Sequence, residues 1–337
     1  MAGKKTLYIS ISAALSIVLL WLLFSQIKTP ELLQTLGHIY VPALLAYMGI
    51  SLAAAVIRAL RYKWLLRPYK IGWANMMLVT FIRNSFVDLL PTRLGALSYV
   101  YVLNRRLDFS FESATSSFVL SGIFDFLTLS PFLVLALLTV GFGSISVSLP
   151  ALLAVAFVFF LISFMILWKI VPFSGLLLGI CRAALRIFHF ENKKWAMISV
   201  EKFQATIESL REAREKKIDL PLFFLSLLIR LGKYVSIYFL LFALLRSHGF
   251  SLSTFSFWKL ILGITGAELT SILPVKGLAG FGTWESAWTL TFGLMNFDQS
   301  LTIISGIGVH LITNLFEYSL GIGSLAVLAL PLLKHKN

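Results

Sequence analysis

Long apolar stretches alternate with short polar segments along almost the whole chain. A helix must contain roughly 20 mainly apolar residues to cross the hydrocarbon core of a bilayer, which is about 30 Å thick. The stretches of this length lie at residues 7–27, 39–60, 115–142, 149–167, 220–245 and within 300–333. The pattern predicts an all-α polytopic membrane protein with about six full transmembrane helices.

Two further apolar stretches are interrupted by similar short motifs, at residues 89–96 and 272–280. Each motif places a basic residue, Arg93 or Lys276, two positions after a proline. Proline removes a backbone donor and glycine permits non-helical dihedrals, so neither stretch continues as a helix. Ordinary polar loops would also explain these motifs. Paired breaks in the two halves of a membrane protein, however, are typical of transporter binding sites.

We therefore expect two re-entrant helical hairpins, because broken backbone at membrane depth needs protein or a watery cavity around it. Their arms are expected at residues 74–90 and 97–103, and at 255–273 and 281–296. Most of the 29 lysines and arginines then fall in cytoplasmic segments, and both termini are cytoplasmic. The halves 1–148 and 149–337 of this single membrane domain have opposite orientations, so they form an inverted repeat.

The composition supports this layout. With 58% hydrophobic and 13% charged residues, the chain is too apolar for a soluble globule. Cytoplasmic loops account for the net charge of +14, so it does not indicate nucleic-acid binding. The single cysteine, Cys181, excludes an internal disulfide and any cysteine-built metal or iron–sulfur site. We expect no cofactor and no metal.

Between residues 169 and 219 ten lysines and arginines stand against six acidic residues, so this segment is expected to be cytoplasmic. Within it, at about 190–219, charged residues separate the apolar ones. The apolar residues recur at helical spacing, which predicts an amphipathic arm on the cytoplasmic side. They are Ala196, Val200, Phe203, Ile207 and Leu210. A solvated structural arm and an attachment to anionic lipids both fit this pattern.

Ionisable side chains inside the apolar stretches are the main candidates for function, because burying a charge at membrane depth is costly. The ionisable candidates are Arg58, Arg83, Asp88, Arg93, Asp125, Arg230, Lys233, Glu268, Lys276, Glu285 and Glu317. Of these, all but Arg58 and Arg83 are expected to bind the substrate, together with Asn84, Gly277 and Gly280. The carboxylates among them could partner the basic groups, couple transport to protons, or form structural ion pairs. His310 is expected to be a hydrogen-bonded interior histidine, since no other histidine or cysteine lies at metal-binding spacing from it.

Arg93 and Lys276 occupy matched positions after the two prolines, so we expect them to hold a lipid phosphate. Arginine binds phosphate through a bidentate fork and lysine as a point charge. Arg230 and Lys233 lie one turn apart on one predicted helix, and Arg58 and Arg61 lie one turn apart on another. These two sets would be a second symmetric arrangement that lines the lipid path. For Arg58 and Arg61 we expect snorkelling to the cytoplasmic surface instead.

Three motifs carry a resemblance to a known family: Arg58-x-x-Arg61-x-x-Trp64; Asn84 with Leu90-Pro91-Thr92-Arg93-Leu94-Gly95 and Tyr101-x-x-x-Arg105-Arg106; and Pro274-x-x-Gly277-x-x-Gly280-x-Gly282-x-x-Glu285. Over nearly its whole length the chain resembles the lysylphosphatidylglycerol synthase transmembrane-region family, also called the flippase-like domain. The family pattern usually reads Pro-Gly-Arg-x-Gly-Glu in the first hairpin, whereas Thr92 and Ala96 stand here at the glycine and glutamate positions. The resemblance implies a stand-alone lipid-translocating domain of the prokaryotic cytoplasmic membrane, without a soluble aminoacyl-transferase domain.

Three functions fit these observations. The first is a lipid flippase that moves an anionic phospholipid or a lipid-linked precursor between leaflets. The second is a membrane-embedded transferase acting on a lipid-linked sugar or phosphate, with Asp88, Glu268 or Glu285 as its base. The third is an accessory subunit that positions a separate membrane enzyme through the 190–219 arm. Membrane lipids with an anionic headgroup are the expected partners, and the pattern is compatible with an oligomer.

Overall fold

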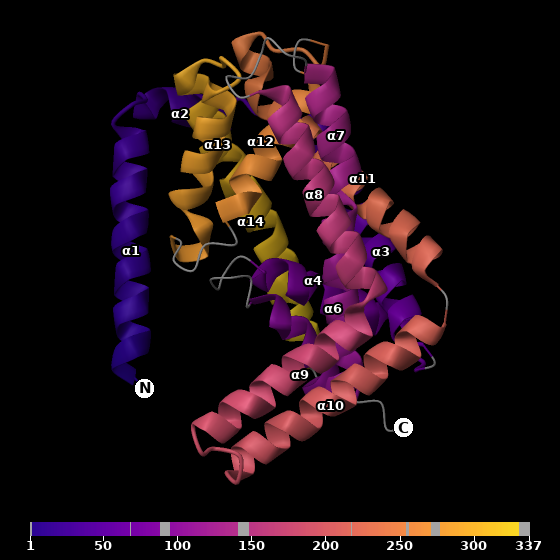
Figure 1. The fold of residues 1–337 in the computed structure, drawn as a ribbon. Coiled ribbons are helices and arrows are strands. Elements are labelled where there is room, and N and C mark those ends of the chain that lie inside the picture. Colours follow the sequence, from indigo (N-terminus) through magenta and orange to yellow (C-terminus); the bar gives the residue numbers. More distant parts are fainter. Residues whose placement is uncertain are drawn as a thin grey trace.

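A computed structural model describes residues 2–67, 69–87, 95–140, 148–216, 218–253, 256–270 and 277–329 (Figure 1). Every regular element in these ranges is a helix, in agreement with the predicted all-α class. The α-helices are α1 (Ala2–Phe24), α2 (Thr29–Gly37), α3 (Val41–Leu65), α4 (Trp73–Phe86), α5 (Ser98–Arg106), α6 (Phe111–Leu127), α7 (Leu129–Val140), α8 (Leu149–Trp168), α9 (Ile170–Ile187), α10 (Lys194–Glu215), α11 (Asp219–Leu245), α12 (Phe257–Leu269), α13 (Thr283–Gly293) and α14 (Gln299–Ala329). Short 3₁₀ turns, η2 (Arg246–His248) and η4 (Leu278–Gly280), follow α11 and precede α13.

Five of these helical segments are long and apolar enough to cross a membrane, which confirms a polytopic membrane fold. They are Val41–Leu65, Phe111–Val140, Ile170–Ile187, Asp219–His248 and Gln299–Ala329. The pair Ala13–Phe24 and Thr29–Gly37 qualifies together as a sixth, although it bends by 90°. Four of the five coincide with predicted spans, and α8 covers the predicted span at 149–167.

The exception is α9, which the sequence pattern placed in the cytoplasmic segment that follows residue 169. Its first three turns are apolar, and its arginines, Arg182 and Arg186, lie toward the C-terminal end. Figure 1 shows α9 beside α10, crossing one end of the bundle at a steep angle to α8. Helix α10 covers most of the predicted arm and also packs on α6, where the hydroxyl oxygens of Ser116 and Ser209 are 2.9 Å apart.

The centre of the bundle is the pair α3 and α11, which have the most extensive contact of any two helices described. Around them the two halves of the chain make matching contacts. Helix α4 of the first half packs on α14 of the second half, and α12 of the second half packs on α7 of the first. Within the first half α5 packs on α6, and within the second half α13 packs on α14. This correspondence supports an internal repeat, while the opposite orientation of the halves in a membrane stays a prediction.

Each predicted hairpin contains two short helices that lie against each other, α4 with α5 and α12 with α13. Glycines allow the close approach. A Cβ on Gly95 would lie 1.5 Å from the carbonyl oxygen of Phe86, so the chain returns directly onto the end of α4. A Cβ on Gly263 would lie 2.0 Å from the ring of Phe292, so α12 and α13 are in backbone-to-ring contact. That these pairs enter the membrane without crossing it stays a prediction.

The described helices form two separate apolar cores. The first is built mainly from α3 to α6 and contains Tyr62, Tyr99 and Phe124. The second is built mainly from α11 to α14 and contains Trp288 and Phe292. Helices α3 and α11 contribute residues to both cores, and polar and charged side chains lie along them between the two.

Candidate functional site

A cavity of about 220 Å³ lies between the two apolar cores. This is far more than one water needs. It is lined by residues of both halves of the chain, from α3, α4 and α6 and from α11, α12, α13 and α14. Its charged lining consists of Arg58, Arg83, Asp125, Arg230, Lys233, Glu268 and Glu317. A cavity with this lining inside an apolar bundle is the candidate functional site.

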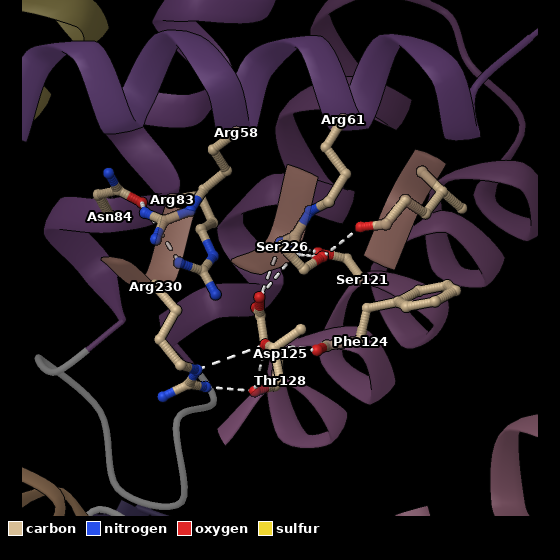
Figure 2. Close-up of polar contacts among 11 residues, drawn as sticks. Arg58, Arg61, Arg83, Asn84, Ser121, Phe124, Asp125, Thr128, Ser226 and Arg230 are labelled. Carbon is tan, nitrogen blue, oxygen red and sulfur yellow. Dashed lines mark hydrogen bonds and ion pairs between the residues drawn. The ribbon is translucent and has the colours of Figure 1, made fainter. Parts of the chain in front are cut away.

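One wall of the cavity is fixed by an ion pair between Arg61 on α3 and Asp125 on α6 (Figure 2). The Arg61 side chain is fully buried and donates hydrogen bonds to Oδ1 at 2.6 Å and Oδ2 at 3.2 Å of Asp125. It also donates to the hydroxyls of Ser226, at 2.7 Å, and Ser121, at 2.6 Å. A buried pair needs further hydrogen bonds to its polar atoms, and the two serines supply them to Nη1 and Nη2, whereas Arg61 Nε is buried without a partner among the described residues.

The expected snorkelling of Arg58 and Arg61 is therefore wrong. Both side chains point into the protein and find acceptors there that compensate for the loss of water: Asp125, Ser121 and Ser226 for Arg61, and Asn84 for Arg58. Arg61 anchors α3 to α6 and α11, while Arg58, one turn earlier, lines the cavity.

Arg58 and Arg83 face the same space from α3 and α4, as Figure 2 shows. Both donate to one neutral acceptor, Asn84 Oδ1, at 2.6 Å from Arg58 Nη1 and 3.3 Å from Arg83 Nη1. The Nε atoms of both arginines are buried and have no hydrogen-bond partner among the described residues. Two guanidinium groups on one amide oxygen create a strongly positive region of the cavity.

Arg230 on α11 reaches the same region from the other half of the chain (Figure 2). It donates to the backbone carbonyl oxygen of Asp125, to Thr128 Oγ1 at 3.4 Å and to the Tyr234 hydroxyl at 3.3 Å. All three acceptors are neutral. Two of them lie at the C-terminal end of α6, where a cation is favoured by the exposed carbonyls.

Farther along α11, Lys233 forms an ion pair with Glu268 of α12. The two side chains are 39% and 18% exposed, so the pair is open to the cavity on one side. Glu317 of α14 also lines this part, together with Tyr47 and Asn314. The cavity therefore has an arginine-rich end and a part lined by one lysine and two glutamates.

Glu285 lies behind the cavity wall and is fully buried. Its Oε2 accepts the backbone N–H of Gly282 at 2.7 Å, which caps α13, and its Oε1 lies 2.5 Å from Nδ1 of His310. The imidazole ring lines the cavity between Phe281 and Trp284, with ring centres 4.6 and 5.0 Å away. The expectation of a hydrogen-bonded interior histidine is confirmed.

The structure brings six predicted site residues together around one cavity: Asn84, Asp125, Arg230, Lys233, Glu268 and Glu317. Glu285 and Gly280 do not line the cavity but contact His310, which does. Glu285 is hydrogen-bonded to the imidazole, and a Cβ on Gly280 would lie 3.4 Å from it. Gly277 instead abuts Ser16 of α1, whose hydroxyl would lie 2.5 Å from a Cβ there. Asp88, Arg93 and Lys276 lie outside the described residues.

Other lining residues were not predicted as site residues. Arg58 and Arg83 carry the general signal of an ionisable group in an apolar stretch, and Asn314 is a polar residue in the last span. The aromatic residues Tyr47 and Trp284 carry no such signal, because tyrosine and tryptophan in spans usually indicate interface anchoring.

The sequence profile of the family described as lysylphosphatidylglycerol synthase TM region matches residues 9–321. The chain belongs to this family. The match covers both halves and every residue of the cavity wall, so the lysylphosphatidylglycerol synthase TM region supplies the whole candidate site. The family is a membrane domain associated with lipid handling. A comparison with curated proteins finds no match.

Proposed function

We propose that this protein is a lipid flippase that moves an anionic phospholipid or lipid-linked precursor between membrane leaflets. The observation that carries the proposal is the excess of guanidinium groups in a cavity built by both halves of the bundle. Arg58, Arg83 and Arg230 use neutral acceptors for the hydrogen bonds described above. A cationic cavity inside an apolar bundle favours a ligand whose headgroup is anionic and whose tails stay in lipid.

The arrangement of the walls supports translocation. Helices of the first half and the second half face each other across the cavity, and the halves make matching contacts. Movement of one half against the other would expose such a cavity to either side in turn, as in transporters with repeats. Both pairs of short helices, α4–α5 and α12–α13, border the cavity through Arg83 and Glu268.

The test is reconstitution of the purified protein in phosphatidylcholine vesicles that contain tail-labelled fluorescent phosphatidylglycerol. Dithionite added outside should bleach the inner-leaflet probe faster than in protein-free vesicles. Arg83→Gln should slow this by about tenfold or more, since a hydrogen bond to a charged group contributes about 1.5–3 kcal/mol. Arg106→Gln is the matched control, because Arg106 is exposed at the end of α5. Rates equal to those of empty vesicles would exclude the proposal.

A transferase acting on a lipid-linked sugar or phosphate is the second candidate, favoured by the Glu285–His310 pair. A carboxylate that orients a histidine facing a cavity is the geometry of a general base. Mass spectrometry of the lipids recovered from the same vesicles separates the two functions. A flippase returns lipid of unchanged mass, whereas a transferase supplied with a lipid-linked donor changes it and loses that activity in His310→Gln.

A further inference from the structure

The arginine-rich end of the cavity contains more positive charge than the described residues around it neutralise. Among the lining carboxylates, both oxygens of Asp125 accept from Arg61, and Glu268 pairs with Lys233. Glu317 is the remaining one, against the three guanidinium groups of Arg58, Arg83 and Arg230. When Arg61 behind the wall is counted with its partner Asp125, the described side chains at the cavity have two more positive than negative charges.

The geometry concentrates this excess at Arg58 and Arg83. Their guanidinium groups come from neighbouring helices, α3 and α4, and share the single acceptor Asn84 Oδ1. Each also has a buried Nε without a hydrogen-bond partner among the described residues. Like charges held this close in a partly buried site repel each other unless an anion lies between them. A guanidinium group presents its donors as a fork, which suits the oxygens of one phosphate.

We propose that this end of the cavity binds a phosphate group with two negative charges, as in a phosphomonoester or a pyrophosphate, in preference to a phosphodiester with one. The proposal rests on the proposed lipid function for its ligand and names the headgroup class. A terminal phosphate offers three acceptor oxygens and close to two charges at neutral pH. A diester offers two free oxygens and one charge, so it leaves one of the two guanidinium groups without a charged partner.

The experiment measures binding and not transport. Purified protein in uncharged detergent at pH 8 is titrated with short-chain phosphatidic acid and with phosphatidylmethanol of the same chains, which differs by one methyl group and one charge. Intrinsic tryptophan fluorescence reports binding, since Trp284 lines the cavity. Wild type should bind phosphatidic acid about tenfold more tightly or better, the effect of one charge-assisted hydrogen bond.

Arg58→Gln and Arg83→Gln should each reduce this preference to about threefold or less, while Arg106→Gln should keep it. Arg83→Lys replaces Arg83→Gln if the latter does not fold, and should lose most of the preference because the fork is absent. Equal affinity of wild type for both lipids, or an equal loss in Arg106→Gln, overturns the proposal.

Glycerol 3-phosphate separates the sources of the phosphate. If it binds as tightly as phosphatidic acid, the site recognises a soluble dianion: the charge preference stands and the flippase proposal fails. If it binds at least about tenfold more weakly, the acyl chains contribute and both proposals stand, since each buried CH₂ adds to affinity. Transport of phosphatidylglycerol combined with equal binding of the mono- and dianionic lipids would leave the flippase proposal intact and overturn the dianion preference alone.

Discussion

Arg61 on α3 and Asp125 on α6 form a bidentate ion pair beside the cavity, and Arg61 has no exposed side-chain surface. Ser226 of α11 completes the set of acceptors around the guanidinium group. The pair therefore joins the first half of the chain to the second through α3, α6 and α11. Its role is to position the wall on which Arg58 and Asp125 line the cavity.

Asp125→Asn should destabilise the protein strongly, because it leaves the Arg61 charge buried without a partner. Breaking a buried pair costs about 3–5 kcal/mol, and the 28% exposure of Asp125 places the effect at the lower end. Thermal unfolding of the purified protein measures it. Replacement of both partners, Arg61→Met with Asp125→Leu, should recover most of the loss, since an apolar pair of similar volume removes the stranded charge.

Glu112→Gln is the matched control on the same helix. Glu112 pairs with Lys202 at 3.1 Å, and Lys202 is 50% exposed. Surface pairs of this kind contribute about 0.2–1 kcal/mol. A loss as large as that of Asp125→Asn would show that the Arg61–Asp125 pair is not a special anchor.

Gly263→Ala tests the contact between α12 and α13. A Cβ at this position would lie 2.0 Å from the Phe292 ring, and that ring is only 2% exposed within the second core. Overpacking of this kind costs about 1–3 kcal/mol, so the melting temperature should fall. Adding Phe292→Leu should restore part of it by making room.

Gly175→Ala provides the comparison for Gly263→Ala. Apart from the backbone of its own helix, no atom lies within 4 Å of a Cβ at Gly175, which is in the second turn of α9. Alanine in a helix interior is favoured over glycine by about 0.5–1 kcal/mol. Stability should therefore be unchanged or slightly higher. Equal destabilisation by both substitutions would contradict the close contact of α12 and α13.

Much of the fold follows from the sequence because membrane spans need roughly 20 apolar residues, a signal that survives without any long-range information. The assignment is difficult where a stretch is long enough for a span but lies in a segment rich in charged residues. Residues 170–187 are apolar enough for a span, but the ten basic residues between 169 and 219 favoured a cytoplasmic segment in the sequence. The broken stretches at 89–96 and 272–280 correctly separated α4 from α5 and α12 from α13.

The site was predictable only in part. The cost of burying charge identified Asp125, Arg230 and Glu268 as interior groups without any structure. It did not reveal how they pair, because Arg58 and Arg61 lie one turn apart and look alike in sequence. Their different roles depend on where α6 and α11 place acceptors around α3, which is a property of tertiary packing.

The sole cysteine reports the orientation of the protein. Cys181 is exposed on α9, and we expect this helix to lie at the cytoplasmic surface with both termini. A membrane-impermeant maleimide should therefore modify it in inside-out vesicles and leave it unmodified in right-side-out vesicles, while Cys181→Ser stays unlabelled. Labelling from outside would reverse the topology. Labelling from neither side would mean that α9 lies in the hydrocarbon.

The last prediction concerns Arg93, the basic residue of the first broken stretch. If the stretch is re-entrant, a cysteine at position 93 in a Cys181→Ser background should react with impermeant maleimide far more slowly than one at the exposed position 106. Position 276 should behave in the same way if the second stretch is equivalent. Reaction as fast as at position 106 would mean an ordinary polar loop.

If Arg93 contacts the lipid phosphate, its substitution should affect transport and not stability. Arg93→Ala should abolish lipid movement with little change in melting temperature, whereas Arg93→Lys should recover only part of it, because lysine keeps the charge and loses the bidentate fork. A structural ion-pair partner behaves differently, since its removal strands a buried carboxylate at a cost of about 3–5 kcal/mol. Transport and unfolding must therefore be measured on the same samples. Lost stability that is rescued by neutralising Asp88 would assign Arg93 to the fold, and lost transport at normal stability would assign it to the lipid.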